Sequence, residues 1–90
     1  MAWFVISYDL RKQRNYQGLY DGLATWKAIP LLESMWLAEL VGPASTVRDL
    51  LRSFVDDDDG IAVLELKAGF DWGAVKCSPA GMAWLKARSP

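Results

Sequence analysis

The sequence contains no histidine, and this absence removes several kinds of chemistry. Without an imidazole, Ser-His-Asp and Cys-His catalysis are excluded, and so are the usual zinc sites. The single cysteine, Cys77, excludes an internal disulfide, and no candidate base accompanies it, so we expect it to be inert. Any bound metal would need oxygen ligands, which favours Mg²⁺, Mn²⁺ or Ca²⁺.

The sequence also lacks an excess of either charge and any long apolar run. Lys and Arg together number 10 against 11 Asp and Glu, so no global basic field draws the chain to nucleic acid. Contact with RNA or DNA would have to come from a local patch. No apolar run reaches the length of a membrane span, and no signal peptide precedes the first expected strand. We therefore expect no membrane partner and a cytoplasmic location.

What the chain has in surplus is apolar side chains. Hydrophobic residues make up 52% of its 90 positions, and five of them are tryptophan. A chain of this length forms one domain with a thin core, burying roughly 60% of its unfolded surface. We expect a single domain over 1–90, with a core of about 2–67 and a C-terminal appendix over 68–90. Part of the apolar surplus then predicts an interface with another subunit.

The strand expected over 3–9 organises the rest, because its aromatic and β-branched residues are typical of a buried strand. Asn15 is a candidate cap for a helix over 16–27, in which Gly18 and Gly22 either permit close packing or are tolerated surface glycines. The junction near Ser34 is either a tight turn or a bend. The remaining expected elements are an edge strand containing Pro30 over 28–33, a central strand over 34–41, a helix from 43 to about 55, a strand over 61–66 and a helix over 79–86.

This order predicts an α+β fold. Two right-handed crossovers convert it into a ferredoxin-like βαββαβ sandwich with an antiparallel sheet and two helices on one face. The first and third strands should be central, and a short C-terminal helix should follow the last strand. The other face of the sheet must then be open, or be covered by something else.

Period-2 alternation assigns the strand residues to two faces. On the last strand we assign Ala62, Leu64 and Leu66 to the helices. This places the carboxylates of Asp9, Glu39 and Glu65 together on the opposite face. The apolar residues expected beside them are Trp3, Val5, Leu37, Val41, Ile61 and Val63. An apolar face should not be left in water, so we expect these six residues to form a homodimer interface across the sheets.

Asp9 ends the first strand and is the main candidate for chemistry. Paired across a two-fold axis, such carboxylates could hold Mg²⁺ or Mn²⁺, which polarises a phosphate and activates water. Alternatively, Asp9 caps the following turn through its side chain. Arg11, Lys12 and Arg14 form a cationic cluster beside it, which either contacts phosphates or is a solvated loop.

Two other features have a functional and a structural interpretation. The run Asp56–Asp59 could suggest calcium, but it lacks the spacing of an EF-hand loop and stands at the C-terminus of a helix. We therefore interpret it as a solvated turn. Trp72 and Trp84 could stack on bases, although packing of the C-terminal segment onto a sheet explains them as well.

Three short motifs resemble a known group of proteins. Ser7-Tyr8-Asp9-Leu10, Leu32-Glu33-Ser34-Met35-Trp36 and Val63-Leu64-Glu65-Leu66 are similar to small bacterial SinR-like proteins. The order of elements and the strand end at Asp9 also resemble the small subunit of CRISPR spacer acquisition and the related VapD-type proteins. The resemblance covers about residues 3–72.

The resemblance implies a homodimer of ferredoxin-like subunits. In some members, aspartates at the ends of the first strands of two subunits face each other and hold a divalent metal that cleaves a phosphodiester. Only Asp9 corresponds to such a residue. Two functions follow: a non-enzymatic dimerising or regulatory module, which the balanced charge favours, and a Mg²⁺- or Mn²⁺-dependent nuclease or nucleic-acid-binding protein that uses Asp9.

Overall fold

The computed structural model describes residues 1–11 and 16–89 of the 90-residue chain. Its elements are β1 (Ala2–Asp9), α1 (Gln17–Thr25), β2 (Ile29–Leu32), β3 (Met35–Leu40), α2 (Ala44–Arg52), β4 (Gly60–Leu66) and α3 (Pro79–Arg88). This is the predicted order, including the helix at the C-terminus. α1 and α2 end about two to three residues earlier than the apolar spacing predicted. The expected cap Asn15 lies outside the described residues.

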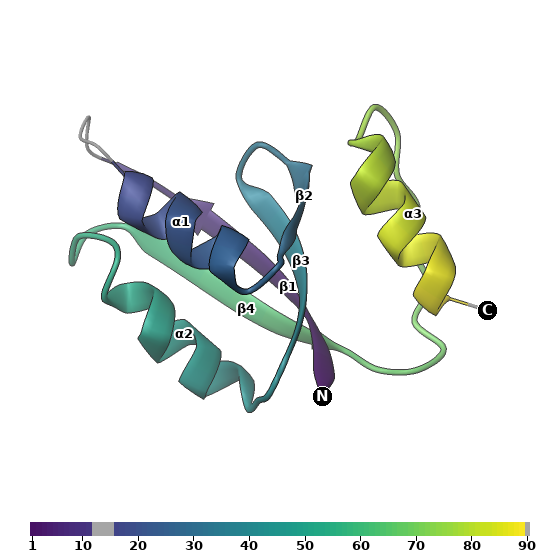
Figure 1. The fold of residues 1–90 in the computed structure, drawn as a ribbon, viewed down its shortest axis with the longest axis horizontal. Coiled ribbons are helices and arrows are strands. Elements are labelled where there is room, and N and C mark those ends of the chain that lie inside the picture. The colour runs from purple at the N-terminus through teal and green to yellow at the C-terminus, as the bar shows by residue number, and fades with distance from the viewer. Residues whose placement is uncertain (12–15, 90) are drawn as a thin grey trace.

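The protein has an α+β architecture in which four antiparallel strands form one sheet in the order β2-β3-β1-β4 (Figure 1). β1 and β3 are therefore central, as predicted, and β2 lies at an edge. Pro30 fits there, because an edge strand can lack an N–H on its outer side. Glu33 and Ser34 form a tight turn between β2 and β3, which decides between the two expected forms of that junction.

α1 and α2 cover one face of the sheet. Each helix presents a stripe of buried aliphatic residues to Phe4 and Ile6 of β1, which are fully buried. The buried helix residues are Leu19 and Leu23 of α1 and Val47 and Leu51 of α2. Gly22 allows close packing, because a Cβ there would lie 3.0 Å from the Phe54 ring. At Gly18 the same test gives an ordinary contact of 3.9 Å.

α3 packs against the other face, over β2 and β3. Its buried Trp84 and Leu85 form a second apolar cluster with Leu31 and Leu37, against which Trp3 and Val5 also pack. Ser78 caps the helix by accepting a hydrogen bond from the N–H of Gly81 (2.9 Å). The N–H of Ser78 donates to the Leu31 carbonyl (3.0 Å), and its hydroxyl donates to the Pro30 carbonyl. The start of α3 is thereby bonded to the outer edge of β2.

The predicted face assignment of β4 is wrong. Ile61, Val63 and Glu65 lie opposite Tyr8, Ile6 and Phe4, so they share the face that α1 and α2 cover. Ile61 and Val63 pack against the core on that face, whereas Leu64 is 57% exposed on the opposite face. Both faces of β4 are apolar, so alternation alone could not orient it. Glu65 suggested the solvent side, but it lies near the end of the strand, where its carboxylate reaches Lys67 (2.8 Å).

This correction changes the expected dimer interface. Ile61 and Val63 are not on the predicted open face, and Trp3, Val5 and Leu37 are packed beneath the C-terminal segment. Phe70, for example, contacts Trp3 edge-on at a centroid distance of 6.0 Å. Of the six residues, Val41 remains largely exposed, at 74%. Residues 68–89 therefore cover much of the surface that we assigned to a partner.

The close approach of α3 to β2 is open to a direct test. A Cβ at Gly81 would meet Leu31 Cδ1 at 2.8 Å and Leu31 Cα at 2.9 Å, so Gly81→Ala must displace the helix. We expect it to lower the free energy of unfolding by about 1–3 kcal/mol, as overpacking does. Chemical denaturation followed by tryptophan fluorescence measures this. Gly73→Ala is the control, because nothing lies within 4 Å of its Cβ position. Equal midpoints for both variants would contradict the packing described.

Candidate functional site

Asp9 lies at the end of the central strand β1, opposite Gly60 of β4. Its side chain alternates with that of buried Tyr8, so it belongs to the face away from α1 and α2. The carboxylate is 75% exposed and forms an ion pair with Arg11 Nε at 3.5 Å. A rigid strand thus presents Asp9 to solvent, as the sequence suggested, but a cation of the same chain accompanies it.

The other carboxylates that we grouped with Asp9 are elsewhere. Glu39 opposes Trp3, six residues from Asp9 along β1, which separates the two by about 20 Å. Glu65 opposes Phe4 on the other face. Within residues 1–11 and 16–89, no three His, Cys, Asp or Glu side chains gather as metal ligands. The described residues of one chain therefore do not form a Mg²⁺ or Mn²⁺ site at Asp9.

Asp59 and Asp58 bond Arg11, the last residue after β1 that the structure describes before residue 16. A capping aspartate accepts the N–H two residues ahead, which for Asp9 is the N–H of Arg11. That N–H instead donates to Asp59 Oδ1 at 2.8 Å. Arg11 Nη1 also donates to the carbonyl of Asp58 at 2.8 Å. Asp59 thus takes the hydrogen bond from Arg11 that a capping Asp9 would accept, and the rest of that turn lies outside the described residues.

Asp59 joins three segments that are distant in sequence. Its Oδ2 accepts hydrogen bonds from the Tyr16 hydroxyl (2.9 Å) and from the N–H of Asp56 (2.9 Å). One carboxylate therefore connects the end of β1, the start of α1 and the turn before β4. Sequence reasoning missed this role, because four identical neighbours give no indication of which one points inward. The Asp-Gly step before β4 was the one available signal of a tight structural turn.

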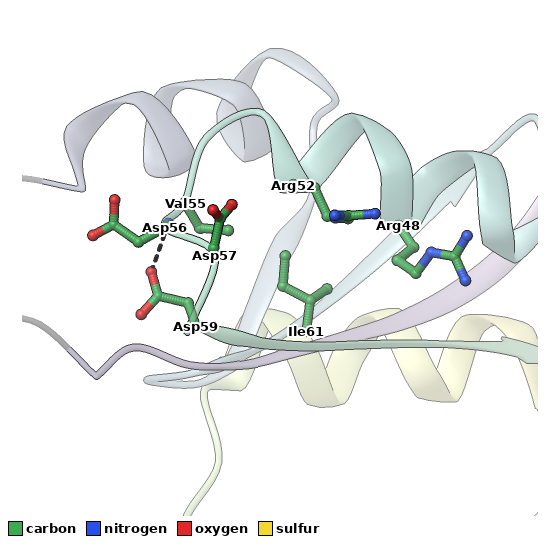
Figure 2. Close-up of a pocket in the computed structure, with 7 residues that line it drawn as sticks. All are labelled: Arg48, Arg52, Val55, Asp56, Asp57, Asp59 and Ile61. Carbon is green, nitrogen blue, oxygen red and sulfur yellow. Dashed lines mark hydrogen bonds between the residues drawn. The ribbon is translucent and has the colours of Figure 1, made fainter.

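A cavity of about 460 Å³ lies between α2 and the start of β4 (Figure 2). Arg48 and Arg52 line it from α2, Ile61 from β4, and three members of the acidic run from the turn between them; these are Asp56, Asp57 and Asp59. Arg48 also pairs with Asp49 at 3.0 Å, while both arginines stay exposed. The cavity therefore has a cationic and an anionic end. The sequence analysis did not single out this combination.

The structure describes one of the three residues of the predicted cationic cluster, Arg11. Arg11 contacts Asp9 and Asp58 with its guanidinium, so its charge is balanced locally. Lys12 and Arg14 lie outside the described residues. Of the three residues predicted to contact phosphate, only Arg11 can be located, and its guanidinium already contacts carboxylate and carbonyl oxygens.

The tryptophans of the C-terminal segment are used for packing. Trp84 is buried between α3, to which it belongs, and the sheet, and the Arg88 guanidinium stacks on its ring at 4.0 Å. Trp72 Nε1 donates to the Ser89 hydroxyl at 3.0 Å. Trp72 and Cys77 line an apolar hollow of about 330 Å³ between this segment and the sheet. These contacts support packing rather than base stacking.

None of the described helices has the length and apolarity needed to span a membrane.

Next to Asp9, the side chain of Tyr8 points into the core. Its hydroxyl donates to the Glu33 carbonyl (3.0 Å) and accepts from Trp36 Nε1 (3.0 Å), which fixes the tight turn between β2 and β3. Burial raises the pKa of Tyr8 above 10.0, and the hydrogen bond from Trp36 opposes this increase. Tyr8 is therefore a neutral structural group.

We expect Tyr8 to destabilise the fold at alkaline pH. Because its pKa is raised in the folded state, the unfolded chain loses this proton first. The stability that Tyr8 contributes is thus complete below pH 10 and is lost as the pH rises through the folded pKa. Tyr8→Phe should cost about 1–3 kcal/mol at neutral pH, because Trp36 Nε1 loses its acceptor. Its unfolding free energy should then fall less steeply between pH 9 and 11. Parallel slopes for both proteins would contradict this assignment.

Asp59 and Asp57 provide a matched pair for testing the acidic turn. Asp59→Asn replaces an acceptor with an amide donor and should cost about 1–3 kcal/mol, as loss of charge-assisted hydrogen bonds does. Asp57→Asn changes an exposed side chain and should stay within about 0.5 kcal/mol of the wild type. Urea denaturation compares the two. If both substitutions had the same effect, Asp59 would not have the connecting role described.

No family model, curated protein or solved structure matches this chain. Its function must therefore be argued from its own residues and from the arrangement just described.

Proposed function

We propose that this chain is a ferredoxin-like module that self-associates as a homodimer and has no catalytic role of its own. The strand order β2-β3-β1-β4, with α1 and α2 on one face, supports a split βαβ arrangement. The observation that carries the proposal is the apolar surface left on β4. Leu64 is 57% exposed beside exposed Ala62, on a sheet face that α3 covers mainly over β2 and β3.

The charges near Asp9 favour this module over an enzyme. Arg11 already neutralises the Asp9 carboxylate, and Asp58 and Asp59 hold Arg11 in place. The whole chain carries a net charge of −1, which gives no general attraction for a polyanion. A dimerising or regulatory module needs neither a metal nor a basic surface.

The second candidate is a Mg²⁺- or Mn²⁺-dependent nuclease acting on RNA or DNA. The 75% exposure of the Asp9 carboxylate at the end of a rigid strand favours it, because a second subunit could approach there. Such a site would need Asp9 from both subunits, and a divalent cation would then stabilise the dimer by binding only the assembled site.

Sedimentation velocity with and without Mn²⁺ separates the two candidates. Under the first proposal the protein is a dimer at tens of micromolar, and neither Mn²⁺ nor Asp9→Asn changes that. Under the second, Mn²⁺ tightens the wild-type dimer, and Asp9→Asn abolishes the effect together with any cleavage of RNA or DNA. A wild-type monomer in both conditions would contradict both candidates.

A further inference from the structure

We propose that the outer edge of β4 is the homodimer interface and that two copies pair antiparallel about Val63, so that Glu65 of the partner subunit enters the cavity lined by Arg48 and Arg52. This inference rests on the proposed homodimer and assigns its surface. It follows from the hydrogen-bonding direction of the strands, the weak edge protection and the positions of the charges.

The backbone groups of β4 that face outward can be identified from the ladder. The N–H of Tyr8 points toward β3, since it donates to the Ser34 carbonyl at 3.1 Å. Directions alternate along a strand, so Ser7 and Asp9 bond toward β4, where Ala62 and Gly60 oppose them. The N–H and C=O groups of Ile61, Val63 and Glu65 therefore point away from the sheet.

This edge carries little of the usual protection, since Glu65 is the one charged residue of β4. Among the described residues, β4 pairs with β1 alone, and its seven residues include no proline and no lysine. The opposite edge differs, because β2 has four residues, contains Pro30 and is bonded to Ser78. A long, apolar, weakly protected edge is a template for another strand. A second copy of β4 can pair with this edge, because it presents the same unpaired backbone groups.

In the pairing centred on Val63, the outward-bonding residues of one β4, Ile61, Val63 and Glu65, lie opposite the same three residues of the second copy. Val63 lies opposite its own copy, and Ile61 lies opposite Glu65 of the partner subunit. Opposed side chains have Cβ atoms about 4.5–5.5 Å apart, so this glutamate stands beside Ile61 at the cavity. Arg48 and Arg52 line the same cavity, as Figure 2 shows. On the other face, Leu64 meets Ala62 of the partner subunit and loses its exposure.

Charge excludes the neighbouring registers. The central register also brings Lys67 of the partner subunit opposite Asp59, at the anionic end of the cavity. A shift centred on Leu64 would instead place that lysine opposite Ile61, beside two arginines. A shift centred on Ala62 would place Glu65 of the partner subunit opposite Asp59, among the acids of the turn. Like charges directly opposite each other are unfavourable, so the central register is selected.

The central register also decides against a shared Asp9 site. The two copies of Asp9 lie opposite the two copies of Gly60, at the far ends of the paired strands. They are separated by about six residues along the strands and three strand spacings across them, or roughly 25 Å. No single metal ion can bridge that distance.

Two complementary variants test the charge contact. Glu65→Lys should weaken the dimer at least about 100-fold. The symmetric dimer contains this contact twice, and in each copy of it the substitution would put a positive charge beside Arg48 and Arg52. Arg48→Glu combined with Arg52→Glu should do the same, because it faces Glu65. Each variant alone should sediment as a monomer at tens of micromolar, and an equimolar mixture should form a heterodimer. Glu33→Lys, an exposed charge reversal in the β2–β3 turn, should leave the dimer unchanged.

Cysteine pairs in a Cys77→Ser background test the register. Ala62→Cys and Leu64→Cys should each fail to cross-link alone and should form a mixed disulfide when combined, because only that pair comes within disulfide reach. A wild-type dimer that tolerates Glu65→Lys, or that cross-links Ala62→Cys to itself, would overturn this interface while leaving the homodimer in place. A wild-type monomer would overturn the homodimer as well.

Discussion

The structure depends on a central strand that is apolar on both sides. Phe4 and Ile6 of β1 are fully buried on one face, and Trp3 and Val5 need cover on the other. The crossover connections supply α1 and α2 to the first face only, so a second cover must come from another part of the chain or from a partner. Residues 68–89 provide much of it, and Trp3, Trp72 and Trp84 belong to the apolar cluster that forms there. The self-association that we propose then concerns the strip of sheet that this segment does not reach.

The order of elements and the central position of β1 could be predicted, because strong local patterns and right-handed crossovers leave few alternatives. The faces of β4 could not, since Ile61, Leu64 and Val63 are equally apolar and the pairing with β1 decides their direction. Packing of the C-terminal segment onto a sheet could be expected, but the strands that α3 contacts could not be predicted. Its contacts with β2 depend on Ser78 and on the missing side chain of Gly81, and neither produces a periodic signal.

The candidate site shows a similar division. The end of β1 marked Asp9 as exposed and rigidly placed, which is correct, but its neighbours are set by segments about 50 residues away. Asp59 reaches Arg11 and Tyr16 because the antiparallel pairing of β4 with β1 brings Gly60 opposite Asp9. A carboxylate that accepts several hydrogen bonds stabilises a junction strongly, and so one acid of the run is structural while Asp57 remains solvated. Composition alone cannot distinguish such neighbours.

The bonds between Ser78 and β2 have a consequence for the homodimer that we propose, because they limit how large such an assembly can grow. A sheet with two free edges can add copies without end and produce a filament, whereas a sheet with one free edge stops growing after a single symmetric pairing. The start of α3 occupies the outer edge of β2 in every copy, which leaves β4 as the one edge for growth among the described strands. If two copies pair as we propose, the C-terminal helix stops the assembly at the dimer and so prevents open-ended aggregation along the sheet edges.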